Sequence, residues 1–504
     1  MAVRMTGLVS GMDTESIVKE LMATQESKKK RITDKQTTLT WKEEKWKELN
    51  TKLYKLYTDN VSKMRLQGSY QTKKATASDD SKAVITAGTS APVGAHTLEV
   101  KELASSQYVT GKKLDTTITS SSTFSQLGFD NTDEIVITVG NDEPVKLTVN
   151  SDTTVSQFLQ TCKDAGLNAS YDTTQKRFFI SSTTSGTDGA FTMSSKNGAL
   201  ESLGLGQING TATTPATGED GVTVDGMTVV EASNATIILD GAKLTSSNNT
   251  IIANGLTINL KGVTSEVINL NVSNDTEATY NMIKGFVKEY NDILKSMNEL
   301  YYADSAYGYD PLSDDEKEAM SEEEVEKWET KIKNSLLRRD STLGQLTNAM
   351  KNSMMSSVEV DGKSYSLSSF GINTSKDYTE KGLLHIAGDK DDATYATETD
   401  KLMKAFEEEP NTVMNALSQI GMSLYKTMGD QMKSIPNVKS ALTFYNDKDI
   451  QKKQTTYKKE LSALEDRLAK MEARYYKQFS AMETALSKLE SQSSALSGLL
   501  GTNS

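Results

Sequence analysis

The sequence predicts a multidomain α+β protein with long terminal α-helical coiled-coil arms, a helical leg domain and inserted β-rich head domains. Three observations support this fold class. Residues 12–67 and 437–497 contain no glycine or proline, short alternating apolar segments fill the middle of the chain, and helical periodicity returns at about residue 276. As helices, the two terminal runs would each span about 80–90 Å, at ~1.5 Å per residue.

The first arm has a clear helix start. In GLVSGMDTESIVKELM, Asp13 can accept hydrogen bonds from the free amides of the first turn, and Glu15 suits the positive end of the helix. We expect Ile17 and Leu21 to begin the apolar stripe of this arm.

One apolar series along the first arm recurs every seven residues: Ile32, Leu39, Trp46 and Leu53. Leu49 and Leu56 add the second position of a coiled-coil seam, whereas Lys35 and Lys42 hold that position earlier in the helix. The first half of the seam is therefore half polar, which predicts a looser pairing there.

The middle of the chain, from about residue 76 to 275, reads as β structure. It is rich in Ser, Thr, Asn and Gly, and its apolar residues alternate with period two, as in EIVITV and LTINL. Asp-Gly pairs at 225–226 and 240–241 lie between such segments, which predicts hairpin turns.

Residues 123–206 read as one insert that contains a hairpin and a single short helix. The residues that share one face of that helix are Val155, Phe158, Leu159 and Cys162. We therefore expect the only cysteine to be a buried small hydrophobe rather than a reactive thiol.

Helices return after residue 276. One apolar helix face is formed by Ile283, Phe286, Val287, Tyr290, Leu294, Met297 and Tyr301. Ser313–Glu316 and Ser321–Glu324 both fit the S-x-x-E capping box, which predicts two short helices. The segment VEVDGKSYSL at 358–367 predicts a β-hairpin within this helical region.

The second arm carries a longer apolar seam. Its members are Tyr457, Leu461, Leu464, Leu468, Met471, Tyr475, Phe479, Met482, Leu486, Leu489 and Leu496. The spacing alternates between four and three, apart from one 4–4 step at Tyr475–Phe479, so the pattern is a heptad repeat with one stutter. Because both arms are half apolar, they most simply pair with each other.

The residues alone predict the order helix, β, helix. The β segments would be inserted at the far end of a hairpin-like stalk formed by the two arms.

Composition argues against several classes of protein. The formal net charge is −12, whereas general nucleic-acid binding needs an excess of Lys and Arg. No apolar run has the length of a membrane span, so we expect no membrane insertion, and the N-terminus does not read as a secretory signal peptide. A single cysteine cannot form an intrachain disulfide.

Sites for chemistry are scarce, and we expect no catalytic, cofactor-binding or metal-binding residue. His96 and His385 are the only histidines, both read as structural, and no HExxH, CxxC or P-loop occurs. The acidic segments DSAYGYDPLSDDE and GDKDDATY fail the spacing of a calcium loop. The basic run SKKKR at 27–31 would be spread around a helix, which favours a solvated, register-setting role over contact with a membrane or an acidic partner.

The terminal segments resemble a known family. GLVSGMDTESIVKELM at 7–22 resembles the N-terminal signature of the flagellar hook-associated protein 2 family of filament-capping proteins, and RYYKQFSAMETALSKLESQSSALSGLL at 474–500 is similar to its C-terminal signature. YDPLSDDEKEAMSEEEVEKWETKIKNSLLRRD, LSSFGINTSKDYTEKGLLHI and TIILDGAKLTSSNNTIIANGLTINLKG are similar to the family's C-terminal region. The insert at about 111–206 resembles modules of several flagellar axial proteins.

The resemblance implies a nested layout, in which the chain passes through four parts and returns by the same route. These are a terminal coiled-coil arm (1–45 and 455–504), a helical leg domain with a β-hairpin (46–75 and 276–454), a β-rich head domain (76–110 and 207–275) and an α+β outer head insert (111–206).

The resemblance also implies a structural cap of the bacterial flagellar filament and no enzyme activity. Such a protein forms a homo-oligomeric ring, for which a pentamer is favoured, at the distal tip and promotes the folding and insertion of flagellin. The expected partners are further copies of the chain, flagellin, hook-filament junction proteins and an export chaperone on the C-terminal helix. The expected location is secreted and extracellular, at the filament tip.

The partner or oligomer interface is expected where the family's terminal signatures carry the apolar stripe. Its candidate residues are Leu8, Ile17, Leu21, Tyr475, Phe479, Met482, Leu486, Leu489, Leu496 and Leu499. The alternative function is a surface adhesin, whose β-rich head would bind glycan or host protein. An enzyme carried on a filament is the least favoured reading, because no catalytic motif is present.

Overall fold

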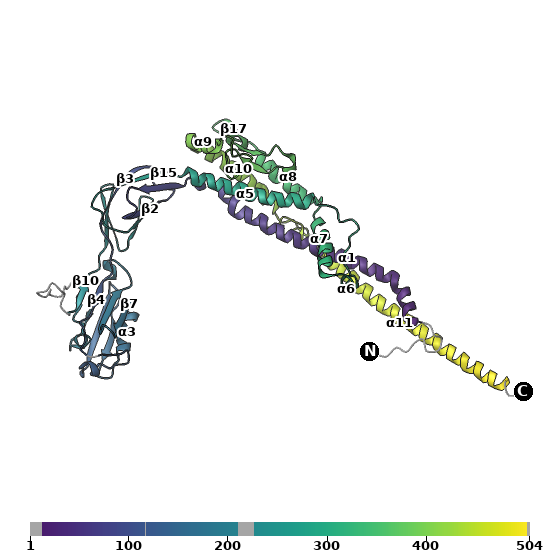
Figure 1. Ribbon diagram of the computed structural model, residues 1–504, viewed down its shortest axis with the longest axis horizontal. Coiled ribbons are helices and arrows are strands. Elements are labelled where there is room, and N and C mark those ends of the chain that lie inside the picture. Colours follow the sequence, from purple (N-terminus) through teal and green to yellow (C-terminus); the bar gives the residue numbers. More distant parts are fainter. Residues whose placement is uncertain (1–12, 116, 210–225, 501–504) are drawn as a thin grey trace. The chain divides into compact units, whose positions relative to one another are not determined.

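The computed structural model describes residues 13–115, 117–209 and 226–500, except for the side chains of residues 498–500. The chain separates into two compact units: one extends up to Tyr70 and resumes at Thr276, and the other is Gln71–Asp275. The first unit is mainly helical and the second mainly β, so the predicted multidomain α+β class is confirmed (Figure 1). The finer four-part division stays a prediction.

The helical unit begins with α1 (Thr14–Lys55) and ends with α11 (Asp447–Leu500). The other helices are the π-helix η1 (Leu56–Val61), α2 (Ser62–Met64), η2 (Gln67–Tyr70), α5 (Thr276–Tyr301), α6 (Asp314–Glu318), α7 (Glu322–Ser335), α8 (Ser341–Met355), η5 (Leu367–Phe370), η6 (Tyr378–Glu380), α9 (Lys401–Glu408) and α10 (Pro410–Gln431). Two hairpins join them: β16 (Val358–Val360) with β17 (Lys363–Tyr365), and β18 (Ile372–Thr374) with β19 (Leu384–Ile386).

Local signals in the sequence place these elements correctly. Asp13 caps α1 by accepting a 3.0 Å hydrogen bond from the Ser16 amide. Ser313 and Ser321 form the two expected capping boxes, at the starts of α6 and α7. The predicted hairpin at 358–367 is confirmed as β16–β17.

One large apolar core holds the helical unit together. It combines the last turns of α1 with η1, α2, α5, α8, α9, α10 and the two hairpins. The predicted apolar face of α5 lies in this core, and Tyr290 and Leu294 on it are almost fully buried. The backbones of α10 and α2 approach closely at Gly421, where an added Cβ would lie 2.8 Å from the Met64 carbonyl carbon.

The β unit contains two pairs of sheets. A five-stranded sheet (β1-β15-β3-β11-β12) packs with a three-stranded one (β13-β14-β2), and a four-stranded sheet (β10-β4-β8-β7) packs with a second three-stranded one (β6-β5-β9) and with α3 (Val155–Asp164). All the strand pairs in these sheets are antiparallel.

The remaining elements of the β unit are short. They are β1 (Lys73–Ala77), β2 (Ala83–Ala87), β3 (Gly94–Glu102), β4 (Tyr108–Thr110), η3 (Ser125–Leu127), β5 (Asp133–Val139), β6 (Val145–Val149), β7 (Leu167–Asp172), β8 (Arg177–Ser182), η4 (Thr187–Gly189), β9 (Phe191–Ser194), α4 (Ala199–Ser202), β10 (Thr228–Val230), β11 (Ala235–Leu239), β12 (Ala242–Ser246), β13 (Thr250–Ala253), β14 (Leu256–Leu260) and β15 (Ile268–Asn274).

Turn chemistry and patterning explain the β unit. Asp240 and Gly241, with φ of 50° and 83°, form the expected two-residue hairpin turn between β11 and β12. The other predicted turn begins at Asp225, outside the described residues. Cys162 lies in α3 with no exposed surface, as expected, and burial raises the pKa of its thiol to about 12.

Candidate functional site: the paired terminal helices

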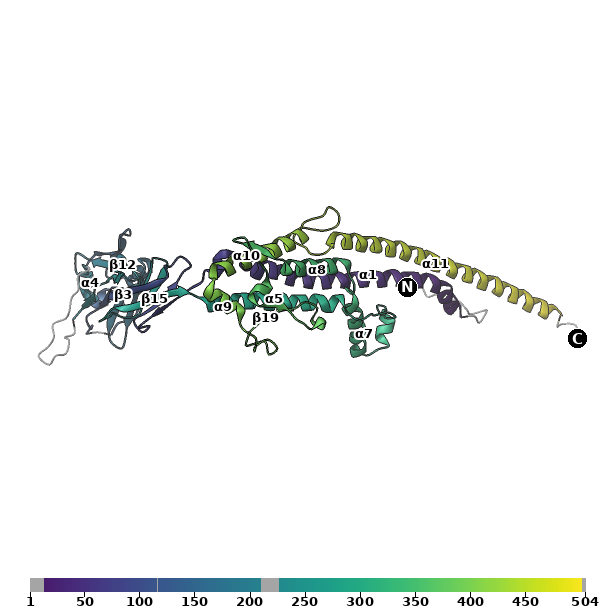
Figure 2. The ribbon, with the colours of Figure 1, turned by 90° about the horizontal axis from the view of Figure 1, so that it is seen from above.

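The first and last long helices, α1 and α11, pair in antiparallel orientation. In Figure 1, and in the perpendicular view of Figure 2, α1 lies alongside α11 over much of its length. The contacts run in opposite directions along the two helices. Lys29 forms an ion pair with Glu465, Glu43 accepts a hydrogen bond from Gln454, and Asn50 accepts one from the amide of Phe444, which precedes α11.

A small apolar cluster closes the pair near the start of α1. Val18, Met22 and Leu468 are buried, with 3%, 6% and 6% of their surface exposed. The partly buried residues around them all come from α11: Leu464, Met471, Tyr475, Tyr476 and Phe479. This cluster is separate from the large core, so each end of the helix pair has its own apolar contacts.

Polar contacts hold the stretch between the two apolar ends. Lys29 Nζ lies 3.2 Å from Glu465 Oε1, and Gln454 Nε2 donates to Glu43 Oε2 at 2.8 Å. Glu43 is only 7% exposed, and its other oxygen, Oε1, lies 2.9 Å from Lys47 Nζ. A buried carboxylate is costly unless it is paired, so these partners fix how the two helices align.

Stacked aromatic rings mark the junction of the pair with the large core. Trp46 of α1 stacks on Tyr445, with ring centroids 5.6 Å apart and an interplanar angle of 8°. Both side chains are buried. Burial, together with the nearby carboxylates of Glu43 and Asp447, raises the pKa of the Tyr445 hydroxyl to about 12, so it stays neutral.

The structure corrects where the stripe of the first arm begins. Val18 and Met22 contact α11, whereas Ile17 is half-buried and Leu21 is 47% exposed. One position along an α-helix turns a side chain by about 100°, which moves Ile17 and Leu21 away from the contact line. The sequence does contain a signal for Val18, because the seven-residue series that includes Ile32 extends back through Gln25 to Val18.

The structure also corrects the polar positions of the seam. Lys35 is exposed, and Lys42 Nζ lies 2.7 Å from Asp340 Oδ2, at the start of α8 rather than on α11. The seam is half polar, as predicted, but its polar residues are Lys29, Glu43 and Asn50. Each of these polar residues lies four positions after a member of the seven-residue series (25, 39 and 46), whereas the sequence pattern placed the polar positions three residues after it.

The basic run at 27–31 contributes to register, as its sequence suggests. Lys29 bonds to α11, and Lys30 Nζ donates to the carbonyl of Pro311 at 3.1 Å and lies 3.4 Å from Glu316. The run is therefore tied to two other segments of the helical unit.

The expected interface residues of α11 divide into two groups. Tyr475 and Phe479 belong to the apolar cluster within the chain, and Met482 and Leu486 are half-buried. Leu489 and Leu496 are each 61% exposed and follow Phe479, the last residue of α11 in the small apolar cluster. Figure 2 shows that the C-terminal part of α11 extends past α1. Leu8 and the Leu499 side chain lie outside the described residues.

Both histidines have structural partners. His96 contacts Asp240 at 2.7 Å, and His385 contacts both Asp392 and Glu380. Within residues 13–115, 117–209 and 226–500, no group of three or more His, Cys, Asp or Glu side chains could hold a metal ion. Over the same residues, no helix combines the length and apolar character that crossing a membrane requires.

These features define a class of protein. Helices from the two chain ends pair along an apolar and polar seam, they join a helical unit, and a β-rich unit is inserted between them. These features describe a two-unit α+β structural protein in which the helices nearest the two chain ends pair with each other.

Comparisons with known proteins identify the family. The model of the flagellar hook-associated protein 2 C-terminus matches residues 232–491, and that of the flagellar hook-associated protein 2 N-terminus matches residues 10–107. The chain belongs to the flagellar hook-associated protein 2 family.

Relatives and a solved structure agree with this assignment. The chain is 28% identical over 445 residues to flagellar hook-associated protein 2 of Halalkalibacterium halodurans, covering 82% of this chain and 79% of the relative. It is 25% identical over 464 residues to the A-type flagellar hook-associated protein 2 of Pseudomonas aeruginosa, covering 86% and 89%. The D1-D2-D3 domains of the Escherichia coli flagellar cap protein FliD share its fold, with a TM-score of 0.51 at 20% identity, over 77% of this chain and 95% of that one. The comparisons give no support to the adhesin alternative.

Proposed function

We propose that this protein is a structural cap of the bacterial flagellar filament. It sits at the distal tip as a homo-oligomeric ring and promotes the folding and insertion of flagellin beneath it. Family membership supports this function. The role is one of assembly and not of catalysis.

One observation carries the proposal about how the ring is held. The apolar seam of α11 continues beyond the stretch that contacts α1 inside the chain, and Leu489 and Leu496 there are each 61% exposed. These residues are seven apart, so they lie on one face of the helix. Large exposed apolar side chains in a row are typical of a surface that another molecule covers.

The terminal arms, at 1–45 and 455–504, therefore carry the proposed contacts between subunits. Leu489 and Leu496 form the exposed part of that interface, and Met482 and Leu486 flank it. A pentameric ring is the favoured assembly. Hook-filament junction proteins and flagellin are the proposed neighbours of the ring.

The same stripe is the proposed binding site of an export chaperone before the protein leaves the cell. The cap is in this view a secreted protein, and a chaperone on residues 474–500 would keep the stripe from premature association. Each large apolar side chain contributes about 1.5–3 kcal/mol when it is fully buried. A few such residues suffice for a partner that must later release the chain.

The experiment substitutes the two exposed leucines of α11 in cells that depend on this protein for motility. Leu489→Asp with Leu496→Asp places two charges in a contact that must exclude water. The matched control is Ser487→Asp with Ser494→Asp, which adds the same charges at two exposed positions, also seven apart, on a different face of α11.

We expect the leucine variant to lose filaments and to release flagellin into the medium, and the serine variant to swim. Secreted amounts of both variants should be measured, because loss of chaperone binding would lower export of the cap itself. Filaments of normal length and number in the leucine variant would contradict the assignment of this face.

A further inference from the structure

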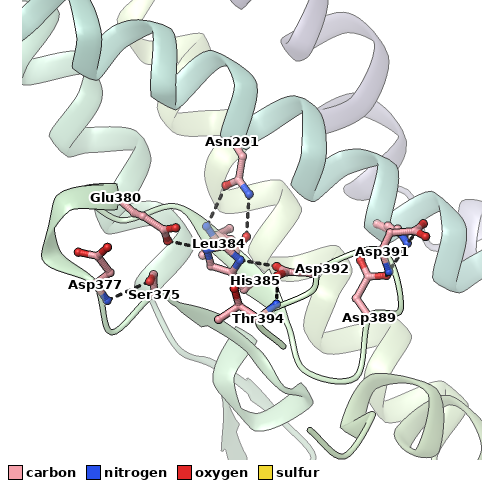
Figure 3. A network of polar contacts seen from close by, with 11 residues as sticks. Asn291, Ser375, Asp377, Glu380, Leu384, His385, Asp389, Asp391, Asp392 and Thr394 are labelled. Carbon is pink, nitrogen blue, oxygen red and sulfur yellow. Dashed lines mark hydrogen bonds and ion pairs between the residues drawn. The ribbon is translucent and has the colours of Figure 1, made fainter. Parts of the chain in front are cut away.

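His385 lies in the helical unit, at the centre of β19. This strand pairs with β18, and His385 is opposite Asn373 in the register. The ring stacks on Tyr395, with centroids 4.5 Å apart and an interplanar angle of 20°. Figure 3 shows Glu380 on one side of the His385 ring and Asp392 on the other, each facing one ring nitrogen.

Both nitrogens of the His385 ring are within hydrogen-bond distance of a carboxylate. Nδ1 lies 2.6 Å from Asp392 Oδ2, and Nε2 lies 2.8 Å from Glu380 Oε2. A neutral imidazole carries one N–H, so it can donate to only one of the two. The bridging arrangement therefore requires the doubly protonated, cationic ring, or else a proton on one of the carboxyl groups.

The two carboxylates belong to different segments. Glu380 ends η6, in the turn before β19, and Asp392 lies in the loop after it. Asp392 Oδ1 also accepts from the Thr394 amide at 3.1 Å, so its carboxylate is tied to the loop backbone. The cationic ring thus joins the turn before the strand to the loop after it.

Helix α5 anchors the strand and the loop independently of His385. Asn291 donates to the Leu384 carbonyl at 2.6 Å and accepts from the Leu384 amide at 2.8 Å. Lys284 bonds to both Asp389 and Asp391. These contacts do not involve the imidazole, so they remain when its charge changes.

The charges around His385 favour the cation. On the α5 side, the groove beside it is lined by Lys284, which is neutralised by its two aspartates, and by Lys288 and Asp292, which pair with each other at 2.9 Å. On the other side of the hairpin, Lys376 and Glu398 line a groove with Tyr395. The charged partners that touch the ring itself are the two carboxylates.

We propose that His385 is a pH-dependent clasp, which ties residues 375–382 to residues 387–395 when its ring is protonated and releases one of them when it is not. In the released state, one carboxylate faces a ring nitrogen lone pair at hydrogen-bond distance, which is repulsive. Asn291 and Lys284 keep β19 and Asp389 on α5, so the opening is local. The clasp does not depend on the cap function.

The direction of the pH dependence follows from the charge. Burial by itself lowers the pKa of His385, but the hydrogen bonds to Asp392 and Glu380 and their negative charges outweigh it, so the pKa is raised above 6.5. The clasp is fully formed below the pKa of the open state and is lost as the pH rises through the pKa of the closed state. For each pH unit by which the pKa of the closed state exceeds that of the open state, the equilibrium constant for opening the clasp rises tenfold across the titration.

The first test is an NMR titration of the full chain with labelled histidine. The chain has only two histidines, so His96→Gln leaves a single imidazole signal, that of His385. We expect its midpoint to lie above the unperturbed value of about 6.5 and to fall when Asp392→Asn removes one carboxylate. A midpoint at or below the unperturbed value, or no change in Asp392→Asn, would overturn the proposal.

The second test measures amide hydrogen exchange over residues 375–395 in the full chain, after correction for the intrinsic pH dependence of exchange. In the unmodified protein, protection should fall as the pH rises through the titration of the His385 imidazole, whose pKa is raised above 6.5. In His385→Gln, which cannot titrate, protection should be low and independent of pH. Equal pH profiles in the two proteins would refute the clasp, whereas the NMR midpoint decides the matter if His385→Gln does not fold.

Discussion

A pair of leucine substitutions separates the contacts inside the chain from the contacts that we propose between chains. Leu468 and Leu489 lie on the same helix, but Leu468 is 6% exposed and Leu489 is 61% exposed. Leu468→Ala removes part of the small apolar cluster that joins α11 to Val18 and Met22. Leu489→Ala removes the same atoms from a side chain that already faces solvent.

The size of the effect follows from the burial. Leu→Ala in a core costs about 2–5 kcal/mol, and the lower end applies here because only three residues of this cluster are buried and its rim can collapse. We therefore expect a loss of about 2 kcal/mol for Leu468→Ala. At 1.4 kcal/mol per tenfold change, this raises the opening constant of the helix pair by roughly 30-fold. Leu489→Ala should stay within about 0.5 kcal/mol, as surface substitutions usually do.

Amide hydrogen exchange on the dilute full-length protein measures how each substitution changes the local stability of the helix pair. Leu468→Ala should reduce protection of residues 14–25 and 460–480 and leave the large core of the helical unit unchanged. Leu489→Ala should leave all of these segments unchanged. If the two variants lost protection equally, or if Leu468→Ala lost none, the assignment of the cluster as the contact that closes the helix pair would be wrong.

Three further predictions test other features of the fold. Gly421→Ala should destabilise the helical unit by about 1–3 kcal/mol in denaturant unfolding, because the added Cβ would lie 2.8 Å from the backbone of Met64. Gly285→Ala in α5 has open space around the added Cβ and should stabilise the unit by up to about 1 kcal/mol. Equal effects of the two substitutions would contradict the close approach at Gly421. The side-chain oxygen of Gln25 is buried with no hydrogen-bond partner among the described residues. Gln25→Leu should therefore raise the protection of α1 against hydrogen exchange by about 1–3 kcal/mol. An unchanged exchange rate of the α1 amides would show that the Gln25 site is solvated. Cys162 should react with a thiol reagent only on unfolding, because burial raises its pKa to about 12, and rapid labelling of the native protein at about pH 8 would contradict its burial.

Local rules gave much of the fold from the sequence. The cap at Asp13, the boxes at Ser313 and Ser321 and the turn at Asp240 each depend on residues within four positions of one another. The long arms were equally accessible, because absence of glycine and proline combined with a seven-residue repeat has few other structural meanings.

Contacts between distant segments could not be read in this way. The seven-residue series locates Val18, but Leu21 and Met22 lie three and four residues after it, and both positions fit a half-polar seam. Only the partner helix shows that Met22 makes the contact. Lys42 finds Asp340 only through the tertiary fold.

The polar network around His385 had no signal in the sequence. Glu380 and Asp392 are five positions before and seven positions after it, and only the hairpin and the following loop bring both carboxylates to one ring. No motif has that spacing, because the contact depends on the loop conformation.

The most direct test of the proposed assembly is electron microscopy of the purified full-length chain and its two double variants. The unmodified protein and Ser487→Asp with Ser494→Asp should both form closed rings, with a pentamer favoured. Leu489→Asp with Leu496→Asp should remain as folded monomers, with the strand content of the β unit unchanged. Rings of normal symmetry in the leucine variant would contradict the claim that the exposed stripe of α11 holds the cap together.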